Sequence, residues 1–191
     1  TNKEKLRLKF PKIIPSSHNI EYTTPHFKKD IDLFIRTTSN LDRNLIAFHR
    51  KELLKRLNKI IEVHSLSGST SGPWLTTNDY REILQRSTIL PSPFGWGELG
   101  VRDYEAFIYG ALLLKPDMSH MDTWPPIFIE NETYVPFKWN FSDLDDKIVY
   151  YLKNNKTRIE IAKNGQKLYK KSISKEGMDA FCEWFINQIE K

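Results

Sequence analysis

The chain has a single cysteine, Cys182, among its 191 residues. One cysteine cannot form an internal disulfide or supply a cysteine zinc site, which excludes both kinds of cross-link within the chain. Its neighbours Phe181 and Trp184 indicate a small core residue. No apolar run approaches the roughly 20 residues of a membrane-spanning helix, and no signal peptide is visible. We therefore expect a cytoplasmic protein without a membrane span.

Long blocks of one charge are also lacking. The chain has 29 Lys and Arg against 24 Asp and Glu, which gives a net charge of +5 and a pI of about 9.1. This mild excess is compatible with a phosphorylated ligand, with nucleic acid or with neither. Because the basic residues are dispersed rather than run together, we do not expect a nucleic-acid partner. A hydrophobic fraction of 39% is enough for a real core.

Composition separates a short lead-in from one domain. Residues 1–29 contain Pro11, Pro15 and Pro25 without a hydrophobic period, which is typical of an extended lead-in or linker. Residues 30–191 are expected to form one domain that ends in helices. The chain begins at Thr1 and not at a methionine, so we expect a fragment or a processed product.

Hydrophobic periodicity predicts strands that alternate with helices. Short apolar runs predict strands at residues 30–35, 60–63, 88–90, 111–114 and 134–137, with a further short strand at 127–129. Helical spacing and capping residues predict helices at 41–60, after Thr76 or Thr77, at 101–109, after Ser142 as far as Asn154, at 157–171 and at 174–188. This alternation predicts an α/β fold, a Rossmann-like parallel sheet with helices on both faces.

The stretch at residues 87–117 reads as strand, glycine-rich loop, helix, glycine and strand. Gly95, Gly97 and Gly100 let the backbone turn and approach a ligand closely, and Gly110 is typical of a helix end. A strand that leads through a glycine loop into a helix is a common device for binding phosphate and nucleotides. Every βα unit also needs a turn, so a purely structural loop is the alternative.

Polar loops are expected at the carboxyl ends of the strands, where parallel sheets bind ligands. The loops at Arg36, Ser65, Gly95 and Asp117 are predicted to converge there on one site. Arg102 lies in the first turn of the following helix, a position that disfavours a cation unless an anion is near. These features indicate a phosphate-bearing ligand.

The residues around this loop also resemble a known signature. Glu105-Ala106-Phe107, followed by residues 110–114 (Gly-Ala-Leu-Leu-Leu), is similar to the E-A-apolar-x-x-G-x-P-V-I signature of group 1 glycosyltransferases of the GT-B fold. Pro91-Ser92 falls where that family has its P-S. The resemblance covers residues 29–171. A weaker likeness to the protein O-glucosyltransferase family rests on residues 134–136 (Tyr-Val-Pro), 141–144 (Phe-Ser-Asp-Leu) and 161–166 (Ile-Ala-Lys-Asn-Gly-Gln).

The resemblance implies the carboxyl-terminal, nucleotide-sugar-binding half of a GT-B enzyme. The implied reaction is hexosyl or pentosyl transfer from a nucleotide-diphospho sugar to a glycan or other hydroxyl acceptor, in polysaccharide or glycan synthesis, with no metal or other cofactor. The group 1 likeness implies retention at the anomeric carbon and the O-glucosyltransferase likeness implies inversion. Because the chain is too short for both GT-B domains, we expect an N-terminal acceptor domain to be missing or to be replaced by a partner.

The resemblance also implies roles for particular residues. Glu105 would hold the donor ribose, Arg36 would face the diphosphate, and Glu98 would contact the donor sugar. In the family, seven residues separate the two glutamates, whereas six separate Glu98 from Glu105 here. At the family's own spacing, the position of the first glutamate is Gly97. The lysine that the family has five places after its arginine is Leu41 in this chain. The predicted catalytic residues are Glu98 and Arg36, and the predicted donor nucleotide-binding residues are Glu105, Gly95, Trp96, Gly97, Arg43 and Arg102.

Two other classes of function remain open. Asp30-Ile31-Asp32 and Asp143-Leu144-Asp145 match the D-x-D of metal-dependent GT-A enzymes, but one begins a strand and the other begins a helix, so we predict no metal site. A non-catalytic α/β module that binds a nucleotide or a protein partner is the other alternative. It predicts that the loops at Arg36 and Gly95 do not converge. His120 either lines the cleft or is an ordinary surface histidine.

Overall fold

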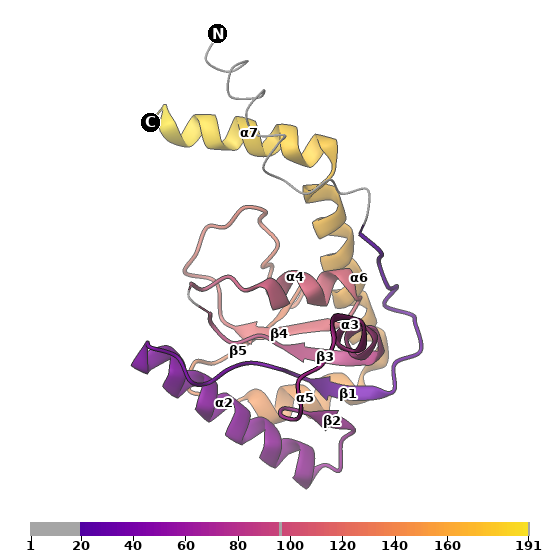
Figure 1. Cartoon of the computed structure of the whole chain (residues 1–191). Coiled ribbons are helices and arrows are strands. Elements are labelled where there is room, and N and C mark those ends of the chain that lie inside the picture. Colours follow the sequence, from indigo (N-terminus) through magenta and orange to yellow (C-terminus); the bar gives the residue numbers. More distant parts are fainter. Residues whose placement is uncertain (1–19, 96, 191) are drawn as a thin grey trace.

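The structure is a computed structural model and describes residues 20–95 and 97–190 (Figure 1). Most of the lead-in predicted for residues 1–29 lies outside these residues, as does Trp96. Residues 20–29 run along the domain, where the backbone N–H of Thr23 donates to Ile108 O at 3.0 Å. The carbonyl of Thr23 accepts from Gln166 Nε2 at 2.8 Å. This segment is therefore hydrogen-bonded to the domain that follows it.

Five parallel strands form the central sheet in the order β2-β1-β3-β4-β5. β3 and β4 are buried along their whole length, which explains their nearly continuous apolar sequences. The chain passes from β1 outward to β2 and returns on the other side of β1 as β3, so the direction of winding reverses there. Open parallel sheets bind ligands at such a reversal, outside the carboxyl ends of the strands. The strands are β1 (Ile31–Phe34), β2 (Gly68–Ser69), β3 (Ser87–Pro91), β4 (Leu112–Pro116) and β5 (Val135–Phe137).

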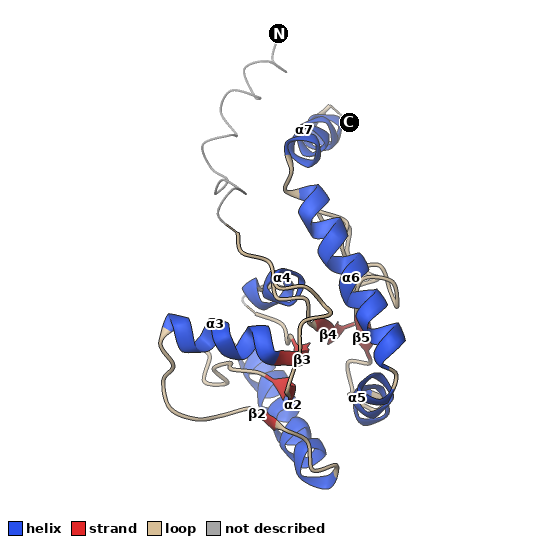
Figure 2. Ribbon diagram, turned by 90° about the vertical axis from the view of Figure 1, so that its right-hand side faces the viewer, coloured by secondary structure: helices blue, strands red, loops and turns tan. Residues whose placement is uncertain are grey.

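Helices cover both faces of the sheet, as predicted (Figures 1 and 2). α2 (Asn44–Val63) and α5 (Leu144–Lys153) pack on one face, where Leu57 and Ile148 are fully buried. α3 (Thr77–Arg86) and α4 (Val101–Ile108) pack on the other through Leu84 and Phe107. The α/β, Rossmann-like fold class predicted from the alternation is therefore confirmed.

The chain ends in two helices, of which the first packs against the sheet and the second lies beyond it (Figure 2). α6 (Asn155–Ser172) contributes Ile161 to the core on one face and Leu168 to the core on the other. α7 (Lys175–Ile189) follows it, and its Trp184 stacks on Trp124 with ring centroids 5.7 Å apart. No helix within residues 20–95 and 97–190 is both long and apolar enough to cross a membrane.

Several predicted boundaries are confirmed by local geometry. Thr76 caps α3, because its side chain accepts from the backbone N–H of Asp79. Gly110 follows α4 with a φ of +60°, and a Cβ there would lie 2.6 Å from Thr23 O. Asn154 separates α5 from α6, and Ser174 caps α7. Capping and glycine patterns thus predicted helix ends where the responsible side chain is local.

Three predictions about elements are wrong. Residues 60–63 form the last turn of α2 and not a strand, because Ile60 continues the buried stripe of Leu53 and Leu57. The second strand comes later, at Gly68–Ser69, so Ser65 lies before a strand and not at its carboxyl end. Residues 127–129 are not a strand, although Glu130 forms an isolated bridge with Tyr134.

The predicted cap at Ser142 is wrong as well. α5 begins at Leu144 with Asp143 at the N-cap, and that carboxylate makes no capping bond within the helix. Instead Asp143 Oδ1 accepts from the backbone N–H of Lys138 at 2.8 Å. The preceding Phe141 has a φ of +62°, which turns the chain into the helix. A tertiary loop contact therefore replaces the local cap here.

Candidate functional site

The loops after β1 and β3 lie together at the carboxyl edge of the sheet. Arg50, from α2, donates through Nε to Phe94 O at 2.8 Å and through Nη1 to Thr38 O at 2.9 Å. Arg102, from the first turn of α4, donates through Nη2 to Arg36 O. Three hydrogen bonds thus join the two loops. The loops at Arg36 and Gly95 therefore converge as predicted, which is the opposite of what the module alternative predicts, whereas Ser65 precedes β2 and does not lie at this edge.

Three guanidinium groups gather at this junction without a counter-ion. Arg36, Arg50 and Arg102 form no ion pair with a carboxylate within the described part of the chain. Arg36 Nη1 donates to Ser69 Oγ at 3.0 Å, while its buried Nε has no partner. Burial lowers the pKa of Arg36, and burial together with the nearby Arg102 lowers the pKa of Arg50. A bound anion would relieve both effects.

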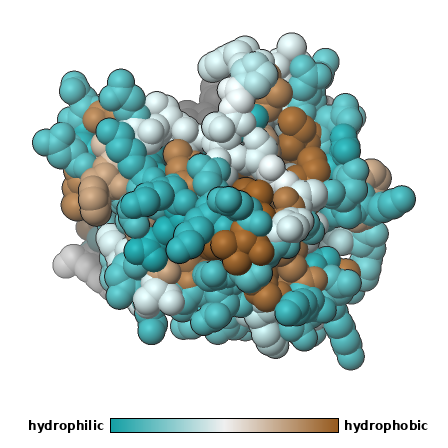
Figure 3. Space-filling view, turned by 90° about the horizontal axis from the view of Figure 1, so that it is seen from below, coloured by the Kyte–Doolittle hydropathy of each residue, from teal (hydrophilic) through white to brown (hydrophobic). Residues whose placement is uncertain are grey.

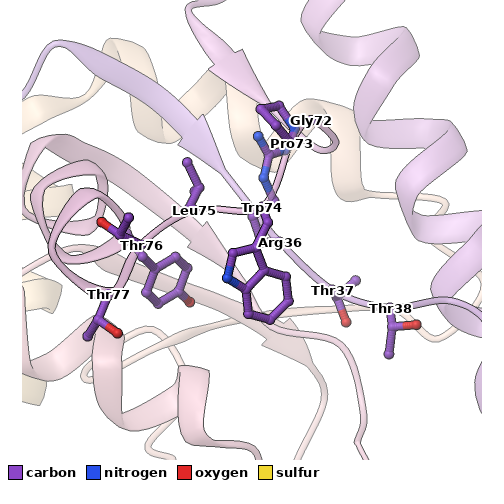
Figure 4. A pocket seen from close by; sticks show the side chains of 10 residues that line it. Arg36, Thr37, Thr38, Gly72, Pro73, Trp74, Leu75, Thr76 and Thr77 are labelled. Carbon is purple, nitrogen blue, oxygen red and sulfur yellow. The ribbon is translucent and has the colours of Figure 1, made fainter.

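A pocket of about 640 Å³ opens beside Arg36, within the size range of small-molecule sites. A Cβ at Gly72, whose φ is +143°, would lie 2.5 Å from Arg36 Nη2, so a glycine there lets the guanidinium approach the loop. Trp74 is 98% exposed. In Figure 4 its indole ring lies between Thr76 and Thr77 on one side and Thr37 and Thr38 on the other. The lining residues are Arg36, Thr37, Thr38, Gly72, Pro73, Trp74, Leu75, Thr76, Thr77 and Tyr80.

Glu105 adjoins this pocket through Tyr80. The phenol of Tyr80, which lines the pocket, donates to Glu105 Oε2 at 2.9 Å. Burial raises the pKa of Tyr80 to about 12, so the phenol stays a hydrogen-bond donor at neutral pH. Glu105, which the resemblance assigns to the donor ribose, therefore lies beside the same pocket as Arg36, although 69 positions separate the two residues in sequence.

The glycine loop is shaped by close contacts and by open space. The backbone N–H of Gly95 donates to Gly97 O at 2.9 Å, which tightens the turn. A Cβ at Gly95 would lie 3.5 Å from Arg50 Nη2, whereas a Cβ at Gly97 would meet nothing within 4 Å. The predicted site residue Trp96 lies outside the described residues. The predicted Arg43 is exposed at the N-cap of α2 and does not line the pocket beside Arg36.

A buried ion pair lies beneath the glycine loop. Lys115, at the end of β4, lies 3.1 Å from Asp103 Oδ2, and neither side chain is exposed. Asp103 also accepts from the backbone N–H of Gly100 at 2.9 Å, and Lys115 Nζ donates to Glu98 O at 2.7 Å. Burial lowers the pKa of Lys115, and Asp103 opposes that shift. The pair therefore fixes both ends of the segment from Glu98 to α4.

Glu98 itself faces His120. The two side chains approach to 2.5 Å between Oε2 and Nε2. Glu98 comes from the loop after β3 and His120 from the loop after β4, so the pair spans two neighbouring loops at the carboxyl edge. Within the described residues, no group of three or more His, Cys, Asp or Glu side chains could hold a metal ion.

A second, apolar pocket of about 410 Å³ lies between α2 and the loop after β5. Figure 3 shows the face of the molecule that carries α2, where apolar side chains reach the surface among polar ones. The ring of His49 packs against the ring of Phe141, with centroids 4.6 Å apart and planes tilted by 34°, and neither nitrogen of the imidazole has a hydrogen-bond partner. Burial, followed by the charges of Lys115 and Arg50, lowers the pKa of His49 to about 4. The imidazole is therefore neutral at physiological pH.

Sequence reasoning missed Arg50, Lys115 and Tyr80. Lys115 had a usable signal, since it is a lone cation that directly follows the apolar run at residues 111–114. Arg50 had none, because α2 carries several other basic residues and nothing local distinguishes this one. In the sequence, Tyr80 is recognisable only as one residue of the apolar face of the helix after Thr76. Each acts through a partner far away in sequence, which periodicity does not reveal.

Comparison with known proteins gives one family and two structural neighbours. A family model described as glycosyl transferase-like matches residues 43–176. The crystal structure of TarM matches with a TM-score of 0.59 at 16% identity, over 88% of this chain and 37% of TarM. The C-terminal domain of a glycosyl transferase group 1 family protein (LpcC) from Francisella tularensis matches with a TM-score of 0.55 at 14% identity, over 82% of this chain and 97% of that domain.

At these identities the two structures show the fold alone, which is that of the C-terminal domain of a GT-B protein. The chain spans little more than a third of TarM, at 37% of its length. Comparison with curated protein sequences finds no match.

Proposed function

Because the chain belongs to the glycosyl transferase-like family, we propose that it is the donor-binding half of a glycosyltransferase that uses a nucleotide-diphospho sugar. The reaction is a hexosyl or pentosyl transfer to an acceptor hydroxyl in glycan or polysaccharide synthesis. It releases a nucleoside diphosphate, so negative charge grows on the leaving group as the sugar departs. A site for this chemistry needs fixed positive charge where that group lies.

The arginine cluster is the observation that carries this proposal. Arg36, Arg50 and Arg102 lie at the reversal of the sheet, at the start of α4, and have no carboxylate partners among the described residues. A guanidinium binds phosphate oxygens through two parallel N–H bonds, and the start of a helix adds a favourable dipole. The cluster would hold the diphosphate and stabilise it as it leaves.

The adjoining pocket suits the nucleoside. Glu105 lies one hydrogen bond from the pocket wall and could accept bonds from two ribose hydroxyls. The exposed ring of Trp74 offers a face on which a nucleobase could stack. Gly95 and Gly97 would leave the backbone open to the diphosphate, since a Cβ at Gly97 would meet nothing within 4 Å.

We also propose that transfer needs no metal ion. In many enzymes that cleave diphosphates, a divalent cation neutralises the leaving group. Here three guanidinium groups supply that charge directly. Turnover that continues unchanged in excess chelator is expected, and loss of turnover on chelation with recovery on adding manganese would contradict the proposal.

Isothermal titration with uridine, guanosine and deoxythymidine diphosphates tests the donor site. We expect one of them to bind, and Arg36→Ala and Glu105→Ala each to weaken that binding about 10- to 100-fold, because each removes hydrogen bonds to a charged group. Arg86→Ala is the matched control, since Arg86 pairs with Asp30 at the amino end of the sheet. Failure of all three nucleotides to bind, or equal losses in Arg86→Ala, would refute the proposal.

We propose further that the acceptor site lies in a second domain. Support comes from the length of the chain, which covers only part of TarM. The described chain by itself should then bind donor nucleotide but transfer sugar poorly. Fast transfer by a monomer of this chain alone would contradict a separate acceptor domain. The proposal for the donor site would be unaffected by that result.

A further inference from the structure

The apolar pocket of about 410 Å³ adjoins the arginine cluster, on the side away from the proposed nucleoside pocket. Arg50 joins the two pockets, because it donates to the carbonyl of Thr38 in the wall of one and to that of Phe94 in the wall of the other. The loops after β1 and β2 line the nucleoside pocket, whereas α2 and the loops after β3 and β5 line the apolar one. The strand order β2-β1-β3-β4-β5 sets these loops in succession along one edge of the sheet. A donor with its diphosphate at the cluster would therefore have the apolar pocket beyond its diphosphate.

Aromatic rings form most of the wall of this pocket. The rings of Phe94 and Trp139 pack with centroids 4.5 Å apart, and the ring of His49 lies against those of Phe94 and Phe141. Phe48 and Trp139 are 66% and 49% exposed, so a ligand can reach both rings. An aromatic face is apolar, and it suits the side of a sugar ring that presents C–H groups. The pocket therefore offers platforms for a ring-shaped ligand.

Polar side chains stand among these rings. Glu52, Arg56 and Asn140 also line the pocket. Arg56 Nε pairs with Glu52 Oε1 at 2.9 Å, and neither side chain is buried. Asn140 Oδ1 accepts from the backbone N–H of Ser142 at 3.0 Å, which leaves the amide NH₂ to donate to a ligand. Sugar hydroxyls both donate and accept, so they match a carboxylate, a guanidinium and an amide, whereas a hydrocarbon chain would use none of them.

His49 gives a second reason to expect a ligand with hydroxyl groups. Its two ring nitrogens are buried and have no hydrogen-bond partner among the described residues. Unpartnered polar atoms inside a protein are uncommon and destabilising. A neutral imidazole has one donor and one acceptor nitrogen, and a hydroxyl that reached the ring could satisfy either. An apolar ligand could satisfy neither.

We propose that this pocket binds one sugar ring of the acceptor glycan, an inference that rests on the proposed function. Trp139 and Phe48 stack on the ring, and Glu52, Arg56 and Asn140 bind its hydroxyls. The second domain holds the hydroxyl that reacts, and the pocket holds another ring of the same acceptor. The assignment applies to either anomeric outcome, because the pocket takes no part in breaking or forming bonds.

A cover of apolar side chains from the second domain is the competing account. The exposure of Leu45, at 78%, and of Phe48 favours it, and Figure 3 shows apolar side chains at the surface of the face that carries α2. Such a cover would also take the charges of Glu52 and Arg56 out of water, which is costly. It predicts that small molecules do not reach Trp139 in the full-length protein.

Saturation-transfer NMR on the natural full-length protein tests the proposal. The probes are the methyl glycosides of glucose, galactose, mannose and N-acetylglucosamine, with 1-hexanol as an apolar probe. We expect at least one glycoside to receive saturation from aromatic protons of the protein. Trp139→Ala should weaken its binding about 10-fold and Glu52→Gln about 3-fold, while the affinity for the nucleoside diphosphate stays within about twofold. Tyr150→Ala is the matched control, since Tyr150 is 50% exposed, like Trp139, but lines neither pocket.

A sugar nucleotide distinguishes the acceptor from the donor as the source of the sugar ring. With the sugar nucleotide bound, the glycoside signal should persist; its loss would assign the pocket to the donor sugar and overturn the acceptor assignment. Hexanol binding without glycoside binding, no glycoside signal, or an undiminished signal in both Trp139→Ala and Glu52→Gln would also overturn it, and the donor site would stand. Failure of all three nucleoside diphosphates to bind would instead refute the proposed function, and the acceptor assignment with it.

Discussion

Two ion pairs adjoin the glycine loop, and they differ mainly in burial. The Lys115–Asp103 pair has no exposed side-chain surface, whereas Glu98 and His120 are 36% and 42% exposed. Lys115 links the two pairs, because it belongs to the buried one and also donates to the backbone carbonyl of Glu98. Opposite charges at similar separations therefore occur in two very different environments within one short segment.

The difference indicates separate roles for the two pairs. A buried charge is costly unless it is paired, so the Lys115–Asp103 pair resists any movement that would separate its members. An exposed pair contributes little to stability and stays accessible to solvent. The buried pair thus anchors the glycine loop, whereas the side chains of the exposed pair remain accessible. Four predictions test this contrast, beginning with the largest expected effect.

Lys115→Met should lower the free energy of unfolding by about 3–5 kcal/mol, because it leaves the Asp103 carboxylate buried without its partner. Urea denaturation of the variant and the wild type measures this. The control is Lys115→Met with Asp103→Asn, which removes both charges and keeps an oxygen for the backbone N–H of Gly100. We expect the double variant to recover most of the loss. A single variant as stable as the wild type would show that the buried pair does not hold the loop.

His49 extends the contrast to a buried histidine. Its pKa falls from 6.5 to about 4 in the folded state, chiefly through burial, so the unfolded chain binds more protons between those values. Stability from this group is complete above about pH 6.5 and is lost as the pH falls toward 4. We expect a loss of roughly 2 kcal/mol once solvent near the half-buried ring is allowed for.

The comparison variant for this prediction is His49→Phe, which fits among Phe94 and Phe141 and cannot titrate. Urea unfolding at pH 7 and pH 4.5 should show a smaller drop for the variant than for the wild type. Equal drops in the two proteins would mean that the imidazole is charged in the folded state.

Arg50→Ala should cost about 1–2 kcal/mol of stability, because Phe94 O and Thr38 O each lose a charged donor. Donor affinity should fall as well, since these two bonds align the loops on both sides of the site. Arg50→Lys keeps the charge but lacks the fork that reaches both carbonyls, so it should restore little. Thermal unfolding and nucleotide titration report the two effects. Full restoration by lysine would show that charge alone matters.

Glu98→Gln should change the free energy of unfolding by less than about 1 kcal/mol, because the pair with His120 is exposed. The expected thermal midpoint is therefore close to that of the wild type, in contrast to Lys115→Met. A loss as large as that of Lys115→Met would mean that the outer pair is also structural, and the contrast between the two sides of the loop would disappear.

Much of the fold followed from local patterns. β3 and β4 were predictable because a strand buried on both faces is a short apolar run, and α3 because Thr76 caps it. Residues 60–63 were misassigned because a short apolar run at a helix end looks like a strand. β2 could not be predicted from Gly68–Ser69, since only pairing with Leu33 and Phe34 makes these residues a strand.

The amino-acid sequence by itself determined the alternation of strands and helices, the glycine loop and the resemblance that pointed to Glu105 and Arg36. Only the tertiary structure decided which charges are buried, which histidine is neutral and that Glu98 meets His120 across 22 positions. The physical reason is that hydrophobic period and capping act within a few residues, whereas burial and ion pairing depend on what the folded chain brings alongside.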